Sequence, residues 1–279
     1  MIRTAKVRRS LFAAGWRLTD RDRRILRMLH DHFVLTTSQL LAAEFSSRGR
    51  AETVMGRLRG MGLVDGFRPP VPVGSTPYHW CLTTAGSQLL DPDDDEEKWS
   101  PRAVLSLLGS QRLAHHLGVT GFFTALLGVA RRHPGCALPV WWSERTCKRK
   151  WGVVVRPDGY GVWREDGRRV PFLLEYDAGT EDVSRLRGKL SDYAHLLPVM
   201  THLTWVLFTF PTRRREDAAR RAFTGTALPV ATGVIDGGAT PADAVWLPVD
   251  RSGPRLRLAE LPNAGDAMAA QEAAFRRAA

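Results

Sequence analysis

Apolar residues recur at helical spacing in the first part of the chain and predict three helices. The first helix follows Thr19, a favourable N-cap, and its apolar stripe consists of Ile25, Leu26, Leu29 and Phe33. A second, short helix is predicted to begin at about Thr36. The third follows the polar turn at residues 46–50 and is expected to bury Ala51, Val54, Leu58 and Met61. These three segments together predict a small helical unit.

Extended segments follow the third predicted helix. One strand is expected from Val64, residues 67–74 form a proline-rich loop, and residues 78–82 return as a second strand. A further short helix is expected from Thr83. Three helices followed by a two-stranded wing are typical of a winged helix-turn-helix domain. Residues 18–90 resemble winged-helix regulators in the stretches LTDRDRRILRMLHDHFVLTTSQLL, RAETVMGRLRGMGLV and YHWCLTTAGSQLL.

The winged-helix resemblance implies that the third helix enters the major groove of DNA and that the wing lies over the phosphates. Arginine can donate two hydrogen bonds to guanine, and Ser or Thr at a helix start can hold a phosphate. The candidate DNA-binding residues are Ser47, Arg48, Arg50, Thr53 and Arg57 around the helix, and Arg68 in the wing. The alternatives are a solvated helix face and a winged helix that binds protein.

A larger domain is predicted over residues 136–279, after apolar residues 101–135, which predict one or two bridging helices. From Trp151 onward the spacing of apolar residues changes from a helical repeat to every second residue. It predicts strands at 153–155, 160–164 and 170–177, with a hairpin turn at Asp166-Gly167. A helix from about Val183 and a buried strand at 203–210 follow, which implies a parallel strand pair. The expected fold class is therefore α/β: an α+β winged helix followed by a mixed-sheet α/β domain.

Carboxylates gather at one end of the sheet predicted for the larger domain. Glu175 and Asp177 are two residues apart on a strand, so their side chains are expected on the same face. That arrangement is costly unless a cation or a proton lies between the two groups. The hairpin can bring Asp158 to the same end of the sheet. Three converging carboxylates suggest a site for Mg²⁺ or Mn²⁺.

This spacing resembles the motif of a known nuclease fold. Pro157-Asp158, followed by Glu175-x-Asp177 and a helix, is similar to the PD-(D/E)XK restriction-endonuclease-like fold. More narrowly, about residues 18–215 resemble actinobacterial replication-relaxation proteins of plasmids and mobile elements, in the stretches WWSER, VRPDGYGVW, FLLEYDAGTE and LRGKLSDYAHL. The resemblance implies a function on DNA without defining a reaction.

The chain departs from the nuclease motif at one position, because Asp177 stands where the motif has lysine. In nucleases of this fold that lysine orients the attacking water and neutralises charge on the phosphate. Lys189 on the following helix is the candidate substitute. The candidate catalytic residues are Asp158, Glu175, Asp177 and Lys189, with the three carboxylates as metal ligands. The alternative is a degenerate nuclease fold, in which Glu175 and Asp177 form ion pairs with Arg156, Arg185 or Lys189.

The charge of the chain supports a polyanionic partner. Of its 40 basic residues only five are lysine, and the formal net charge is +11. Residues 1–90 carry +8, residues 91–100 carry −5 and residues 101–279 carry +8. The expected arrangement is a basic arm at 1–17, an acidic linker at 91–100 and a C-terminal helix near 267–279. The alternative is that codon usage in a high-GC genome produces the arginine excess.

No stretch approaches the roughly 18 to 20 apolar residues of a membrane span, and the start of the chain contains no apolar signal region. We therefore expect no membrane partner and a cytoplasmic location, associated with the nucleoid or a plasmid. The expected partner is double-stranded DNA, with a homodimer or replication and transfer proteins as further candidates.

Two functions fit these expectations. The first is a DNA-binding protein of plasmid or mobile-element replication, relaxation or transfer, whose nuclease-like domain supports binding or assembly. The second is a Mg²⁺-dependent endonuclease or nickase that uses the cluster of Asp158, Glu175 and Asp177. A transcriptional regulator is a further alternative.

Overall fold

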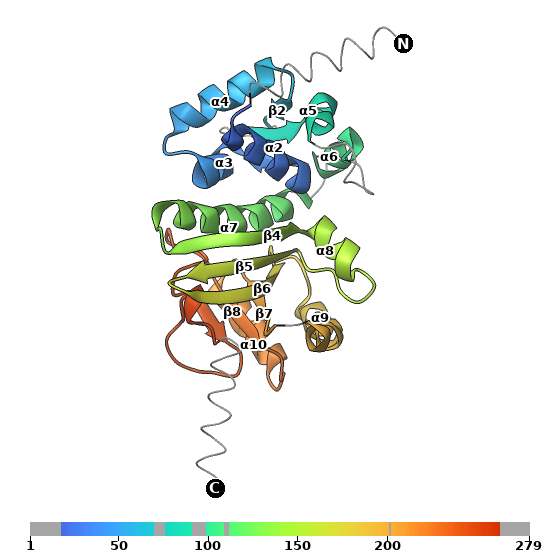
Figure 1. The fold of residues 1–279 in the computed structure, drawn as a ribbon. Helices are drawn as coiled ribbons and strands as arrows, with labels where there is room; N and C mark the ends of the chain where they lie inside the picture. Colours follow the sequence, from blue (N-terminus) through green and yellow to red (C-terminus); the bar gives the residue numbers. More distant parts are fainter. Residues whose placement is uncertain (1–17, 70–75, 91–98, 109–111, 201, 263–279) are drawn as a thin grey trace. The chain divides into compact units, whose positions relative to one another are not determined.

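The computed structural model describes residues 18–69, 76–90, 99–108, 112–200 and 202–262 (Figure 1). The chain forms two compact units, Met1–Thr124 (unit 1) and Ala125–Ala279 (unit 2). The expected basic arm, most of the acidic linker and the expected C-terminal helix lie outside the described residues.

The described part of unit 1 begins with the three helices that the periodicity predicts: α2 (Asp20–His32), α3 (Thr37–Glu44) and α4 (Arg48–Gly60). Side-chain caps fix the N-terminal ends of α2 and α3. Thr19 and Asp22 bond each other's backbone amides, and Thr36 and Gln39 do the same. On α4, Ala51, Met55 and Leu58 are fully buried, whereas Val54 and Met61, which we expected in the core, are only half-buried. The spacing of four and three residues places the first three on one helix face.

A three-stranded antiparallel sheet completes the first part of unit 1. It consists of β1 (Leu35–Thr36), β3 (His79–Leu82) and β2 (Val64–Phe67) in that order. The hairpin of β2 and β3 pairs Val64 with Leu82 and Phe67 with His79. The short helix α5 (Thr84–Leu89) follows and is capped by Thr83.

Two helices occupy the segment after the acidic residues: α6 (Pro101–Leu108) and α7 (Arg112–Arg132). Among the described residues, α7 is the one helix long and apolar enough, by length and composition, to cross a membrane. We expected no stretch of this kind, and that prediction is wrong by length and composition, because residues 113–130 contain no charged side chain. Phe122 and Phe123 of α7 are buried in the fold.

Unit 2 contains a six-stranded mixed sheet, which confirms the α/β class. Its strands, in spatial order, are β4 (Cys136–Ser143), β5 (Gly159–Glu165), β6 (Arg168–Tyr176), β7 (Trp205–Thr209), β8 (Val230–Gly233) and β9 (Trp246–Pro248). The predicted parallel pair is present as β6 and β7, and β8 continues it in parallel. The predicted hairpin turn is also confirmed, because Asp166 and Gly167 both have the positive φ of a type I′ turn.

In the described part of unit 2, α8 (Glu144–Trp151), α9 (Val183–Leu196) and α10 (Arg213–Phe223) accompany this sheet (Figure 1). They share one buried cluster with the strands, in which Cys147 of α8, Leu186 of α9 and Phe223 of α10 pack with Leu173 of β6.

One strand prediction is wrong. Residues 153–155 belong to the turn after α8, and the strand beside β5 at one edge of the sheet is β4, which we did not predict. The side chains of β4 before Ser143 are half-buried or exposed. Its register shifts between Ala137 and Val140, around Pro139. Partial exposure and an internal proline are typical of edge strands, and both obscure the alternation of apolar and polar residues that marks a strand.

Candidate functional site

The candidate DNA-binding residues of unit 1 lie mainly on one face of α4. Ser47, Arg50, Thr53 and Arg57 recur at intervals of three and four residues, which places them on one side of the helix. All four are exposed. Ser47 is the N-cap, and its side chain makes no capping hydrogen bond, unlike Thr19 and Thr36. The Ser47 side chain therefore satisfies none of the first amides of α4.

Two of the α4 candidates also have contacts within the helix. The Thr53 hydroxyl donates to the carbonyl of Gly49 at 2.8 Å. Arg48 lies 3.8 Å from Glu52, in an exposed i,i+4 pair that contributes little to stability. Arg50 is the exposed arginine of this face that lies closest to the start of the helix.

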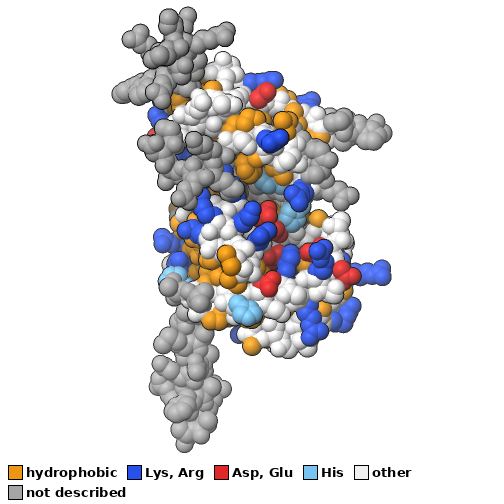
Figure 2. Space-filling model, turned by 90° about the vertical axis from the view of Figure 1, so that its right-hand side faces the viewer, with side chains coloured by type: hydrophobic (Ala, Val, Ile, Leu, Met, Phe, Trp, Pro, Cys, Tyr) orange, Lys and Arg blue, Asp and Glu red, His pale blue; other side chains and the backbone are white. Residues whose placement is uncertain are grey.

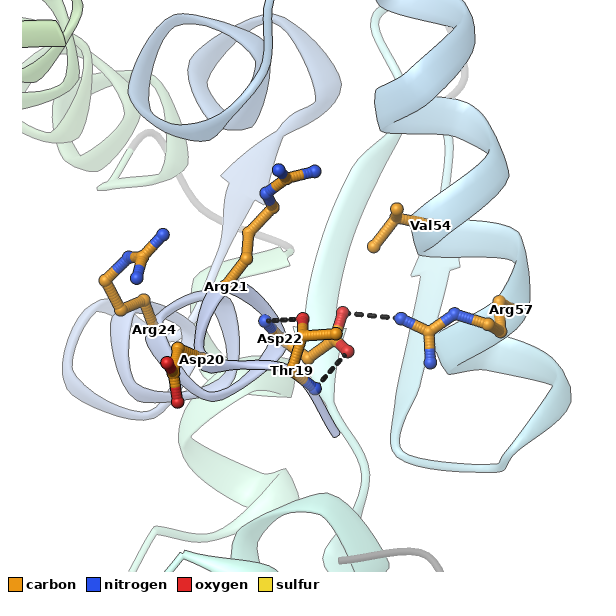
Figure 3. A pocket seen from close by; sticks show the side chains of 7 residues that line it. All are labelled: Thr19, Asp20, Arg21, Asp22, Arg24, Val54 and Arg57. Atoms are coloured by element: carbon orange, nitrogen blue, oxygen red, sulfur yellow. Dashed lines mark hydrogen bonds and ion pairs between the residues drawn. The ribbon is translucent and has the colours of Figure 1, made fainter. Parts of the chain in front are cut away.

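Arg57 connects α4 to the start of α2. Its Nη2 donates to Oδ1 of Asp22 at 2.6 Å, and that carboxylate is only 1% exposed (Figure 3). Burial opposes ionisation of Asp22, but the hydrogen bonds from Arg57 and Thr19 outweigh it and lower the pKa of the carboxyl. These groups border a pocket of about 390 Å³, lined by Thr19, Asp20, Arg21, Asp22, Arg24, Val54 and Arg57. Arg57 therefore has a structural role whether or not it contacts DNA.

We expect Arg57→Ala to destabilise unit 1 by about 1–2 kcal/mol at neutral pH, because Asp22 loses a charge-assisted hydrogen bond while remaining buried. Asp22 has a lowered pKa in the fold. Its ionised form therefore stabilises the fold above the unfolded pKa, and this contribution is lost as pH falls through the folded pKa. The penalty of the substitution should shrink below about pH 4. Urea unfolding across this range measures it, and a penalty independent of pH would contradict this role for Asp22.

The hairpin of unit 1 carries a second group of cations around Tyr78. The guanidinium of Arg68 lies 5.6 Å from the centre of the Tyr78 ring. Arg59 Nη1 donates to the Tyr78 hydroxyl at 2.7 Å, and that hydroxyl donates to the carbonyl of Gly66 at 2.9 Å. Arg59 and Tyr78 were absent from our candidate set. Nothing in their local sequence pattern indicates that Tyr78 would bring the end of α4 and the hairpin together.

In unit 2, the cluster of acidic residues is centred on Glu175. Its side chain is 2% exposed, on the face of β6 that also carries Leu173 of the buried cluster. Lys189 Nζ donates to Oε2 of Glu175 at 2.7 Å, and the Tyr193 hydroxyl donates to Oε1 at 2.5 Å. Lys189 also lies 3.2 Å from Glu181. The structure thus brings Lys189 of α9 to Glu175, which the sequence left undecided.

Asp158 lies immediately before β5 and is close enough to interact electrostatically with both Glu175 and Lys189. Its Oδ2 accepts a hydrogen bond from the amide of Tyr176 at 2.8 Å, which ties it to the end of β6. The hairpin therefore brings Asp158 and Glu175 to the same end of the sheet, as we expected.

Burial raises the pKa of Glu175 to about 7, and the negative charge of Asp158 adds to the shift, against the opposing effects of Lys189 and Tyr193. For Lys189, burial disfavours the charge, but Glu175, Asp158 and Glu181 outweigh it and raise the pKa of the ammonium above its ordinary value. The cluster therefore holds a charged lysine beside a carboxyl group that can exchange a proton near neutral pH.

Asp177 has different partners. It is buried, and its carboxylate accepts hydrogen bonds from Nε and Nη2 of Arg215 on α10 and from the amide of Gly179. Its own amide donates to the carbonyl of Thr209, at the end of the neighbouring strand β7. The chain then turns through Gly179, whose φ is +88°. Asp177 is thus held at the start of α10, while Glu175 is held by α9.

These contacts bear on the expected metal site. Within the described part of the chain, no group of three or more His, Cys, Asp or Glu side chains is arranged to hold a metal ion. The arrangement of Asp158, Glu175 and Asp177 does not fit a three-carboxylate magnesium site, because the ion pair with Arg215 occupies Asp177. Asp158 and Glu175 are the two carboxylates that could act as ligands together.

Sequence reasoning missed two residues of this region. The ring of Tyr193 on α9 is fully buried, but its hydroxyl reaches Glu175. The spacing of Lys189 and Tyr193 places them on one helix face and could have indicated this. Arg215 lies 38 residues from its partner Asp177, and nothing in the local pattern predicts that contact.

The surface around this cluster carries both signs of charge. Figure 2 looks onto the side of unit 2 that carries α8 and α9, where acidic side chains gather with Lys and Arg side chains around them. An acidic centre with a basic surround can accept a polyanion at its rim while repelling it at its centre.

A family model described as replication-relaxation matches residues 26–204 of the chain, which includes most of unit 1 and the strands and helices that hold Asp158, Glu175 and Lys189. Comparison with curated proteins and with solved structures gave no match.

Proposed function

The chain belongs to the replication-relaxation family, and we propose that it is a DNA-binding protein of plasmid or mobile-element replication, relaxation or transfer. Double-stranded DNA is its proposed partner, and the cytoplasm, on the nucleoid or a plasmid, is its proposed location. The observation that carries this proposal is the exposed face of α4, with Ser47, Arg50 and Thr53 beside an uncapped helix start.

Unit 1 acts, in this proposal, as a winged helix. Three helices and an antiparallel hairpin follow each other in the order of that fold, and α4 stands in the position of the recognition helix. The arginines beside Tyr78 would lie over phosphates as part of the wing. A transcriptional regulator would use the same surface, so the biological role depends on which DNA site is bound.

We expect Arg50→Ala to weaken specific DNA binding about tenfold or more, because a base-contacting arginine contributes about 1–3 kcal/mol. The measurement is fluorescence anisotropy with duplex fragments from the chain's own locus. Arg102→Ala, which removes an exposed arginine of α6, is the matched control and should leave affinity within about twofold. Equal affinity of Arg50→Ala and wild type would argue that α4 does not read the groove.

Salt dependence provides a second measure of the same interface. Neutralised phosphates release counterions, so affinity should fall by several orders of magnitude between about 50 and 200 mM salt if six or more phosphates are contacted. A flat salt response would contradict a phosphate-dominated interface.

Unit 2 supports binding or assembly in this proposal. Glu175 is paired with Lys189 and Asp177 with Arg215, so neither buried carboxylate is left without a cation. The exposed basic side chains around the cluster supply contacts for DNA.

A second candidate function is a Mg²⁺-dependent endonuclease or nickase. The observation that favours it is the convergence of Asp158, Glu175 and Lys189, three of the four candidate catalytic residues. Asp158 and Glu175 would hold the ion, which would supply charge stabilisation at a phosphate. Lys189 would contact the water or the scissile phosphate. Asp177 would take part only if it left Arg215.

Supercoiled plasmid DNA that carries the chain's own locus separates the two functions when incubated with the protein and Mg²⁺ or Mn²⁺. Nicking that is abolished by both Asp158→Ala and Glu175→Gln would establish the enzyme. Binding without cleavage in either metal would leave the DNA-binding function and exclude the nickase under these conditions.

A further inference from the structure

The turn after α8 exposes two valines. Val153 is 103% exposed and Val154 is 43% exposed. Along the described ranges of the chain, these two residues and Leu105 are the large hydrophobic side chains that stand exposed. Two adjacent apolar side chains at the tip of a turn form a small exposed apolar patch that a partner could cover.

The backbone holds this turn in a defined shape. The amides of Val154 and Val155 both donate to the carbonyl of Trp151, at 2.8 and 2.9 Å, and the amide of Gly152 donates to the carbonyl of Lys148 at 2.8 Å. A Cβ at Gly152 would lie 2.3 Å from that same carbonyl oxygen, so the tight path requires glycine. Val155 is buried and anchors the end of the turn. The valine tip therefore projects from a rigid base.

Cations flank the tip along the chain. Lys148, Arg149 and Lys150 precede it on α8, Arg156 follows it, and all four are exposed. The Lys150 ammonium lies 4.6 Å from the centre of the Trp142 ring on β4. Four positive charges within nine residues complement the phosphates on both sides of a duplex groove.

We propose that residues 148–156 form a DNA wedge, in which Val153 and Val154 insert between base pairs of a duplex while Lys148 and Arg156 bind the flanking phosphates. Apolar side chains flanked by cations are a known means of unstacking a base step from the minor groove. The wedge rests on the proposed DNA-binding function and adds a second contact, in unit 2. Because Asp158 follows Arg156 by two residues, the unstacked step would lie beside the carboxylate cluster.

The full-length chain tests the wedge with a short duplex from its own locus that carries 2-aminopurine at a flexible TA step. The fluorescence of this base rises when it is unstacked. We expect wild type to raise the signal and the double variant Val153→Ser/Val154→Ser to lose most of that rise. Leu105→Ser removes an exposed apolar side chain elsewhere and should keep the full rise. Exposed valine-to-serine changes should not unfold the protein, and urea unfolding verifies this.

A variant that lacks two cations tests the proposed phosphate contacts on either side of the valines. Lys148→Gln/Arg156→Gln should reduce the salt slope of binding by about two, one for each lost phosphate contact. Arg221→Gln/Arg251→Gln, which removes two exposed arginines elsewhere in unit 2, should leave the slope unchanged.

The wedge is refuted if the valine variant binds DNA and unstacks the base as wild type does. It is also refuted if the valines matter only for binding to vesicles of anionic lipid, since the tip would then contact a membrane surface. Failure of the wild-type chain to bind any duplex would instead refute the proposed function itself, so the two failures are distinguishable.

Discussion

Replacing Lys189 by methionine is expected to destabilise the protein by about 3 kcal/mol near pH 8. Glu175 is 2% exposed and would lose the ammonium that lies 2.7 Å from its Oε2. Asp158 and Glu181 would remain close by with their negative charges. Methionine keeps most of the side-chain volume, so the loss reports the missing charge rather than a cavity.

The loss should depend on pH, and the direction follows from the pKa of Glu175, which the fold raises to about 7. A carboxyl with a raised folded pKa is most favourable to stability below its unfolded pKa, and that contribution is lost as pH rises through about 7. Lys189 has a raised pKa, so in wild type its contribution is fully present below its ordinary pKa. The variant can compensate only by protonating Glu175. Its deficit should therefore be large near pH 8 and small near about pH 5.

Urea unfolding at these two pH values measures the difference. Lys148→Met, which removes an exposed lysine of α8, is the matched control and should change stability by less than about 0.5 kcal/mol. Tyr193→Phe, which removes one neutral donor to Glu175, should cost less than Lys189→Met. An equal deficit for Lys189→Met at both pH values would mean that Glu175 does not carry the charge opposite Lys189.

Helix and hairpin positions in this chain could be predicted because their signals are local. Thr19 and Thr36 cap helices through side chains three residues away, and Asp166-Gly167 adopts the backbone that its turn requires. Strand β4 was not predictable, because an edge strand with an internal proline loses its alternating pattern. The strand prediction at residues 153–155 was wrong for the opposite reason. Three valines have high strand propensity, but the hydrogen bonds to Trp151 impose a turn.

The candidate site was predictable where it follows from strand geometry and helix spacing. The hairpin aligns Asp158 with Glu175, and the length of α9 carries Lys189 back to β6. The partner of Asp177 was not predictable, because it is Arg215 on α10, a helix that comes after α9 and β7 along the chain. Side-chain alternation assumes a continuing strand, whereas β6 ends at Tyr176 and the chain turns away.

Glu175 and Asp177 thus each form an ion pair with a different basic residue. Each carboxylate is buried and faces one cation, Lys189 or Arg215, that is itself partly exposed. A phosphate that approaches either cation would compete with a carboxylate for it. This arrangement favours recognition at the rim of the cluster over chemistry at its centre, unless Mg²⁺ takes over from the cations.

Arg215→Ala is expected to cost about 3 kcal/mol, because Asp177 is 1% exposed and would be left as a buried charge without its guanidinium. Arg215 also donates to the carbonyl of Glu181 before α9, so the start of that helix should loosen as well. Asp177→Asn should cost less, since the amide is neutral and can still bond Gly179. The double variant Arg215→Ala/Asp177→Asn should be more stable than Arg215→Ala alone, which gives a coupling energy of about 1–3 kcal/mol.

Chemical unfolding of the four proteins in the cycle measures this coupling, with Arg214→Ala as the control, because it removes the adjacent exposed arginine. Mg²⁺ adds a functional readout. If Asp177 released from Arg215 joined Asp158 and Glu175 around an ion, Mg²⁺ would stabilise Arg215→Ala more than wild type, since a ligand that binds the folded state raises stability. We expect no such difference, because Glu175 remains paired with Lys189 in the variant. Selective stabilisation by Mg²⁺ would revise this expectation and favour the nickase.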